Sequence, residues 1–248
     1  MHKLSPALAS AVGKLEPNQS KDINIELKAG EPVGKFGQSV DWTLTDQQTT
    51  LTGFITPKLY EREAWKIHTI DPVSVYSGNA KNDMIALSLR TVEPYGGKID
   101  YDKAGAAVGN WFREGTNGYE GANKERYWDG HLSIAPNNID PTAIIISMGN
   151  WNGKAAQLTA KQAIDPATVT KASGPVKYEL TDIGYSDTTG KPLFGSSVKG
   201  MKINQQGQTK GVILVQVLDG EKLKVEKFPD KTAAQVSGFT SAAQIYTR

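Results

Sequence analysis

The chain of 248 residues contains no cysteine and only three histidines, at positions 2, 68 and 131. The absence of cysteine excludes disulfides, thiolate nucleophiles and cysteine-ligated zinc or iron–sulfur sites. Because His2 lies close to a chain terminus, where order is lowest, a site built from all three histidines is disfavoured. We therefore expect no bound metal and no cofactor.

The sequence also lacks an excess of charge of one sign and any long apolar run. Lys and Arg number 28 and Asp and Glu 26, which gives a formal net charge of +2, and the basic residues are scattered. A balanced charge with scattered basic residues provides no basic patch that would bind nucleic acid. No run approaches the roughly 20 apolar residues that span a bilayer, and the apolar run near the N-terminus is short and interrupted by Ser5 and Pro6. We expect no nucleic-acid partner, no membrane span and no signal peptide.

Common phosphate-binding and serine-hydrolase motifs are missing as well. The chain has no Gly-x-Gly-x-x-Gly fingerprint, no P-loop and no Gly-x-Ser-x-Gly elbow. Residues 195–197, Gly-Ser-Ser, lack the strand–turn–helix setting that would make Ser196 a nucleophile. These absences disfavour nucleotide-dependent chemistry and the common serine hydrolases.

Alternating apolar and polar residues dominate what is present. Ser5 as N-cap, Pro6 in the first turn and Gly13 near the end predict one short helix over residues 5–15. Residues 57–70 mix aromatic and charged side chains, which suits a short helix or an ordered crossing segment. Strands are predicted at residues 22–28, 33–36, 39–45, 50–55, 98–102, 106–114, 127–134, 143–148, 176–180, 211–218 and 222–228, the last two joined by a tight Asp-Gly turn.

A segment rich in Ser, Gly, Asn and Asp at residues 72–84 is predicted to be a loop and the domain boundary. It separates an N-terminal β-rich segment, residues 1–76, from a larger domain, residues 85–248. Regular strands with few helices favour a barrel or a sandwich. The predicted fold class is therefore all-β, with a small N-terminal β segment followed by a larger antiparallel barrel- or sandwich-like domain.

Residues 28–37, Lys-Ala-Gly-Glu-Pro-Val-Gly-Lys-Phe-Gly, are followed by Ser-Val-Asp-Trp-Thr-Leu at 39–44. Over about residues 22–56 the chain resembles the last part of lysostaphin-type (M23-like) peptidase domains. In that family a K-x-G-x-x-(I/V)-G turn precedes a strand with a His-x-His zinc motif, and active members cleave peptidoglycan cross-bridges. Here Val40, Asp41 and Trp42 stand where the motif should be. The resemblance implies a small all-β, non-catalytic relative with a scaffold or envelope-binding role outside the cytoplasm.

The segment at residues 127–134, Tyr-Trp-Asp-Gly-His-Leu-Ser-Ile, is the best functional candidate. As a strand it would place Trp128, Leu132 and Ile134 on a core face. The opposite face would carry Tyr127, Asp129, His131 and Ser133 in a row.

Two catalytic arrangements are conceivable around this segment. On the polar face, Asp129 could orient His131 as a catalytic base, or the two residues could bind a metal ion. A polar face that is only hydrogen-bonded has the same pattern. If residues 108–114 pair with the segment, Glu114 and Asp129 become the two carboxylates of a glycoside hydrolase. The plainer interpretation of Glu114 is a surface ion pair.

Aromatic residues gather around the same region, with Trp111, Tyr119, Tyr127, Trp128 and Trp151 within some 40 positions. Beside Asn110 and the carboxylates they suit sugar binding, although tryptophans also fill the cores of β domains. The leading prediction is a non-catalytic protein that binds a carbohydrate or cell-envelope polymer, with ligand contacts from Asn110, Trp111, Tyr127 and Trp128. The alternatives are a glycoside- or ester-type hydrolase using Asp129 with His131 or Glu114, and a purely structural β protein.

Overall fold

The computed structural model describes residues 3–14, 16, 19–28, 30–35 and 43–248 and divides into two compact units, Met1–Thr43 and Leu44–Arg248. The first unit holds α1 (Pro6–Val12) and a two-stranded sheet of β1 (Lys3–Leu4) and β2 (Gly34–Lys35). None of its described side chains is buried.

Helix α1 confirms the predicted N-terminal helix and its capping signals. The Ser5 hydroxyl accepts a hydrogen bond from the Leu8 N–H at 3.3 Å, and Gly13 ends the helix at a φ of 68°, where glycine is favoured. The predicted strand at 22–28 is wrong, because these described residues pair with no strand and alternation alone does not stabilise one. The residues that carry the lost zinc motif, Val40–Trp42, lie outside the described part of the chain.

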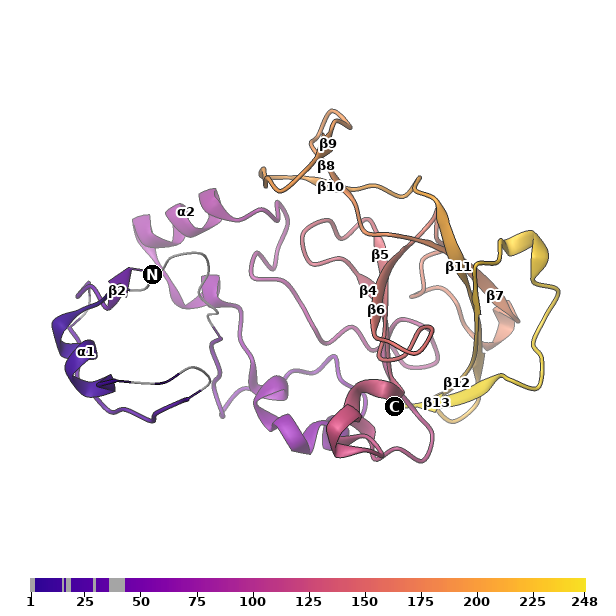
Figure 1. Ribbon diagram of the computed structural model, residues 1–248, viewed down its shortest axis with the longest axis horizontal. Helices are drawn as coiled ribbons and strands as arrows, with labels where there is room; N and C mark the ends of the chain where they lie inside the picture. The colour runs from indigo at the N-terminus through magenta and orange to yellow at the C-terminus, as the bar shows by residue number, and fades with distance from the viewer. Residues whose placement is uncertain (1–2, 15, 17–18, 29, 36–42) are drawn as a thin grey trace. The chain divides into compact units, whose positions relative to one another are not determined.

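The second unit contains a closed antiparallel barrel of eight strands (Figure 1), so the all-β prediction is confirmed in its barrel form. Strands adjacent in the barrel follow one another along the chain, and β13 closes it against β3 through Tyr246 and Arg113. The strands are β3 (Gly109–Arg113), β4 (His131–Pro136), β5 (Ile144–Met148), β6 (Ala156–Ala160), β7 (Val176–Thr181), β11 (Thr209–Leu218), β12 (Lys222–Pro229) and β13 (Gln244–Thr247).

Large apolar side chains fill the interior of the barrel. Trp111, Ile134, Ile146, Tyr178 and Leu223 have at most 1% of their surface exposed and belong to one core cluster. Each comes from a strand whose alternate residues point inward, which is how a small barrel is packed. Any ligand site of this unit is therefore to be sought on the outside.

The outer face of β11 is covered as well. Val212 and Leu214 pack there against Phe228 of β12 and against Val236 and neighbouring residues of the connection to β13, which contains η6 (Ala233–Gln235). The predicted Asp-Gly hairpin between β11 and β12 is confirmed, with Leu218 opposite Lys222. Strand β11 is thus buried on both faces.

Residues 44–104 form no strand, and from this segment Phe54 and Tyr60 pack against Phe112 on the outside of β3. The predicted strands at 50–55 and 98–102 are wrong, since the segments share one backbone hydrogen bond, from the Asp102 N–H to the Gly53 carbonyl at 2.9 Å, and aspartate side chains make the other contacts between them. The Asp100 carboxylate accepts from the Gly53 N–H at 2.9 Å, and the Asp102 carboxylate accepts from the Ile55 N–H at 3.1 Å. The predicted crossing segment at 57–70 is confirmed as η1 (Pro57–His68).

The loop predicted at 72–84 is wrong in its secondary structure. It contains η2 (Pro72–Val75), capped by Asp71, and most of α2 (Gly78–Leu87). Ser, Asn and Asp, which suggested a loop, serve here as helix caps and exposed helix positions. The predicted boundary falls on α2, inside the second unit, and the division into 1–76 and 85–248 stays a prediction.

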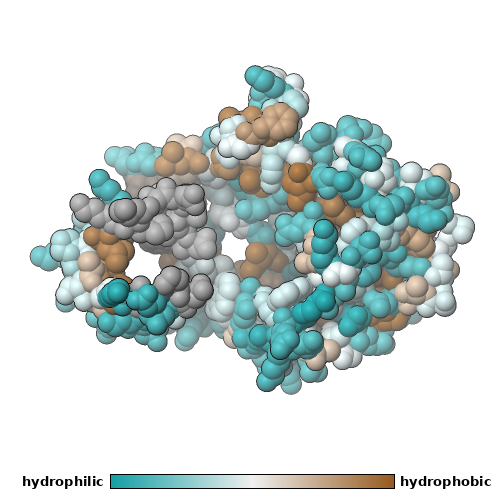
Figure 2. Space-filling view, in the orientation of Figure 1, coloured by the Kyte–Doolittle hydropathy of each residue, from teal (hydrophilic) through white to brown (hydrophobic). Residues whose placement is uncertain are grey.

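A small sheet interrupts the barrel between β7 and β11. It consists of β8 (Tyr185–Ser186), β9 (Pro192–Leu193) and β10 (Lys202–Ile203) and projects from the barrel, with a hydrophilic tip and apolar surface below it (Figures 1 and 2). Phe194, next to β9, has 90% of its surface exposed. No helix in the described part of the chain is long and apolar enough to cross a membrane.

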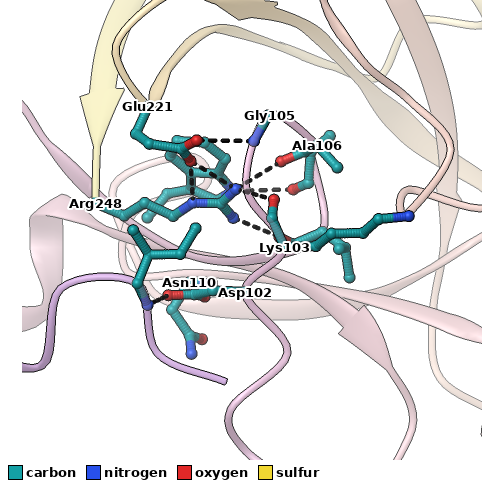
Figure 3. A network of polar contacts seen from close by, with 11 residues as sticks. Asp102, Lys103, Gly105, Ala106, Asn110, Glu221 and Arg248 are labelled. Atoms are coloured by element: carbon teal, nitrogen blue, oxygen red, sulfur yellow. Dashed lines mark hydrogen bonds and ion pairs between the residues drawn. The ribbon is translucent and has the colours of Figure 1, made fainter. Parts of the chain in front are cut away.

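Arg248, next to the end of β13, is the centre of a network of polar contacts (Figure 3). Its guanidinium donates to the Glu221 carboxylate at 2.9 Å and to the carbonyls of Lys103, Ala106 and Val108. The same group lies 3.9 Å above the Trp111 ring, and burial lowers the pKa of Arg248. One buried cation thus joins the segment before β3, the β11–β12 turn and the core.

Candidate functional site

The segment at 127–134 is not one strand, which corrects the interpretation of its two faces. Residues up to Gly130 form η4 (Lys124–Gly130), begun by Asn123, whose side chain accepts from the Glu125 N–H at 2.9 Å. Strand β4 starts only at His131. Trp128 is therefore not a core residue but 39% exposed, and Asp129 does not share a strand face with His131.

Strands β3 and β4 pair with each other, with Asn110 opposite Ser133 and Phe112 opposite His131. Leu132 and Ile134 point into the barrel and are buried. Asn110, Phe112, His131 and Ser133 consequently lie on the outer face, where η3 (Gly118–Glu120) packs against β3.

The two predicted catalytic carboxylates are engaged in separate ion pairs. Asp129 lies 2.9 Å from Arg126, which also donates to the Gly153 carbonyl. Glu114, which follows β3, lies 2.7 Å from Lys222 at the start of β12. No hydrogen bond or ion pair joins Asp129 to Glu114 or His131 among the described residues.

His131 sits among three aromatic rings. Its ring centroid is 4.7 Å from that of Tyr119, 5.2 Å from that of Phe112 and 5.7 Å from that of Tyr127. Burial lowers the pKa of His131 below its ordinary 6.5, so the ring is neutral at pH 7. Its Nε2 lies 3.1 Å from the Tyr119 carbonyl, which can only accept. The proton is thus on Nε2, and the Nδ1 lone pair has no partner among the described residues.

An open groove of about 580 Å³ runs over the outer face of β3 to β6. Its floor includes one polar side chain from each strand: Asn110, Ser133, Ser147 and Gln157. The barrel register places them directly opposite one another, Asn110 to Ser133, Ser133 to Ser147 and Ser147 to Gln157. The floor is therefore one straight row of uncharged hydrogen-bonding groups across four strands, here called the polar row.

Aromatic side chains form the wall of the groove beside β3. The Phe54 and Tyr60 centroids lie 4.5 Å apart, and the Tyr60 ring meets the edge of Phe112 at 5.5 Å. Tyr119 packs against both Tyr60 and Phe112. The Tyr60 hydroxyl is buried without a hydrogen-bond partner, and this burial raises the pKa of Tyr60.

Trp128 lines the groove near the ends of β4 and β5. A Cβ on Gly149 would lie 1.5 Å from the Trp128 carbonyl oxygen, so only glycine permits this approach. The Gly149 N–H in turn donates to the His131 carbonyl at 2.9 Å. Backbone contacts therefore set the position of the tryptophan against the floor.

The groove is nearly free of formal charge. Among the described residues that line it, none is Asp or Glu, and Lys66 is the one with a charged side chain. The Lys66 ammonium lies 3.0 Å from the Glu63 carboxylate, which offsets it. Such a lining suits a neutral ligand.

Only some of the residues predicted to contact a ligand line the groove. Asn110 and Trp128 line the groove. Trp111 contributes to its base but has no exposed surface, and its indole N–H donates to the Ala107 carbonyl at 2.9 Å. Tyr127 does not line it and instead supports Trp128 at 5.2 Å and His131.

Sequence reasoning missed Ser147 and Gln157 altogether and gave Ser133 no specific role. Each is an ordinary polar residue on a half-exposed strand, and only the register of four strands brings them into one row.

No group of three or more His, Asp or Glu side chains gathers as a metal site in the described ranges. Comparison with protein-family models, with curated proteins and with solved structures finds no match to this chain.

Proposed function

We propose that this protein is a non-catalytic carbohydrate-binding protein that holds a neutral sugar in the groove outside β3 to β6. One observation carries the proposal: an exposed tryptophan, Trp128, stands beside a straight row of uncharged hydrogen-bonding side chains. A sugar presents an apolar C–H face and a rim of hydroxyls, and it needs both kinds of surface at once.

The dimensions and composition of the groove favour this ligand class. Ligand sites commonly enclose about 300–1,000 Å³ and combine apolar walls with a few placed polar groups. An aromatic ring also adds contact area at little cost in side-chain entropy, because it has only two rotatable side-chain bonds. The amide, hydroxyl and imidazole groups on the floor can each donate to or accept from a sugar hydroxyl.

The hydrolase alternative has less support in the geometry. Acid–base cleavage of a glycoside requires two carboxyl groups that flank the scissile bond. Here Asp129 and Glu114 are paired with Arg126 and Lys222, and neither lines the groove. We extend the proposal to polymers of the cell envelope as ligands because residues 22–56 resemble lysostaphin-type peptidases.

Titration calorimetry with maltohexaose, cellohexaose, chitohexaose and soluble peptidoglycan fragments tests the proposal. We expect saturable binding of at least one of these ligands, together with a change in tryptophan fluorescence. Trp128→Ala should weaken that binding at least about tenfold, the equivalent of about 1.4 kcal/mol. Phe194→Ala, which removes an exposed ring outside the groove, should leave it unchanged.

Absence of saturable binding to every ligand would overturn the proposal, as would an equal loss in both variants. Activated glycosides and esters provide the test of the alternative. Turnover that disappears in both Asp129→Asn and His131→Ala would establish a hydrolase instead.

A further inference from the structure

We infer that the groove receives the end of a glycan chain rather than a stretch from its middle. This inference rests on the proposed carbohydrate-binding function and adds a direction to it. The terminal sugar would lie at the Asn110 end of the polar row, and the rest of the chain would leave over Gln157.

The Asn110 end of the row is closed by other parts of the chain. The Asn110 side-chain amide donates to the Ile99 carbonyl at 3.1 Å, and its backbone N–H donates to the Asp102 carboxylate at 2.7 Å. Asp102 also holds the Ile55 N–H, which fixes the segment next to Phe54. Segments 53–55 and 98–102 thus form a barrier beside β3, and a polymer running past Asn110 would meet them.

The opposite end is open to solvent. Gln157 and the neighbouring Ala155 are exposed, whereas Asn110, Ser133 and Ser147 are only partly accessible. Three steps between neighbouring strands make the row about 14 Å long. A short oligosaccharide can therefore lie along it with one end enclosed and the other in water.

Unused hydrogen-bonding capacity in the closed half suits a chain terminus. A terminal sugar carries one free hydroxyl more than an internal unit, at the position where the next linkage would be. The Nδ1 lone pair of neutral His131 has no partner among the described residues. This acceptor can take a hydroxyl proton that an internal unit does not offer.

Stoichiometry distinguishes terminal from internal binding. The probes are the monosaccharide, the hexasaccharide and a long soluble polymer of whichever sugar binds in the calorimetric panel. Terminal binding predicts one protein per polymer chain at saturation, whatever the chain length. Several proteins per chain, with their number rising with length, would overturn the inference and leave carbohydrate binding intact.

Two variants locate the ends of the bound chain. Gln157→Ala should weaken the hexasaccharide about fivefold, as expected for one lost hydrogen bond, and leave the monosaccharide unchanged. Ser133→Ala should weaken both ligands by a similar factor. Gln208→Ala, an exposed glutamine outside the groove, is the matched control. Equal effects of Gln157→Ala on both ligands would contradict the direction, whereas loss of all sugar binding by the unmodified protein would reject the proposed function itself.

Discussion

Replacement of Arg248 by alanine is expected to destabilise the second unit by about 3–5 kcal/mol, the range for removing one partner of a buried ion pair. The Arg248 side chain is 1% exposed, and Glu221, its partner, is 26% exposed. The substitution also leaves the carbonyls of Lys103, Ala106 and Val108 without their donor, at about 1–3 kcal/mol for each one that water does not reach. Water that enters the site after the substitution can donate to these carbonyls, so we expect a destabilisation in the lower part of the range of about 3–5 kcal/mol.

Urea denaturation followed by tryptophan fluorescence measures the effect, because Trp111 lies directly beneath the guanidinium. Lys222→Ala is the matched control, since it breaks an ion pair with Glu114 whose side chains are 44% and 51% exposed and which is worth at most about 1 kcal/mol. The loss of stability in Arg248→Lys should lie between those of Arg248→Ala and Lys222→Ala, because an ammonium keeps the charge but not the planar arrangement of donors. Arg248→Ala and Lys222→Ala with the same free energy of unfolding would refute the reasoning.

Three further changes have expected outcomes. Tyr178→Phe should leave stability unchanged or raise it by about 1 kcal/mol in urea denaturation, because its hydroxyl is buried without a partner; a loss above that size would reveal a missed hydrogen bond. Gly149→Ala should reduce sugar affinity and stability together, since its Cβ would displace the Trp128 carbonyl; unchanged calorimetry would contradict this. Because the pKa of His131 is lowered in the folded state, its contribution to stability is complete above pH 6.5 and is lost as the pH falls through the folded-state pKa. His131→Gln should therefore remove that part of the pH dependence of the free energy of unfolding. An identical pH profile in the variant would argue against a buried neutral ring.

Barrel strands with strong local patterns could be predicted from the sequence. Residues 211–218 and 222–228 alternate or run apolar on either side of an Asp-Gly turn, and they form β11 and β12 almost to the residue. The prediction failed where side chains replace backbone pairing. Asp100 and Asp102 hold segment 53–55 through their carboxylates, and alternation around them imitates a strand.

The groove could be predicted only in part. The sequence pointed to Asn110, Trp128 and His131 because unusual residues gather there. It could not place Ser147 and Gln157 beside them, since that depends on the register between strands distant in sequence. Nor could it distinguish the buried Trp111 from the exposed Trp128, because η4 interrupts what looks like one alternating strand.

Amide chemical-shift mapping of the isotopically labelled protein with a saturating hexasaccharide tests the binding groove most directly. We expect the largest shifts at Asn110, Ser133, Ser147 and Gln157 and at the Trp128 indole N–H, with Phe194 unchanged. Shifts that cluster on another face of the barrel, or none at saturating ligand, would contradict a carbohydrate site on the outer face of β3 to β6.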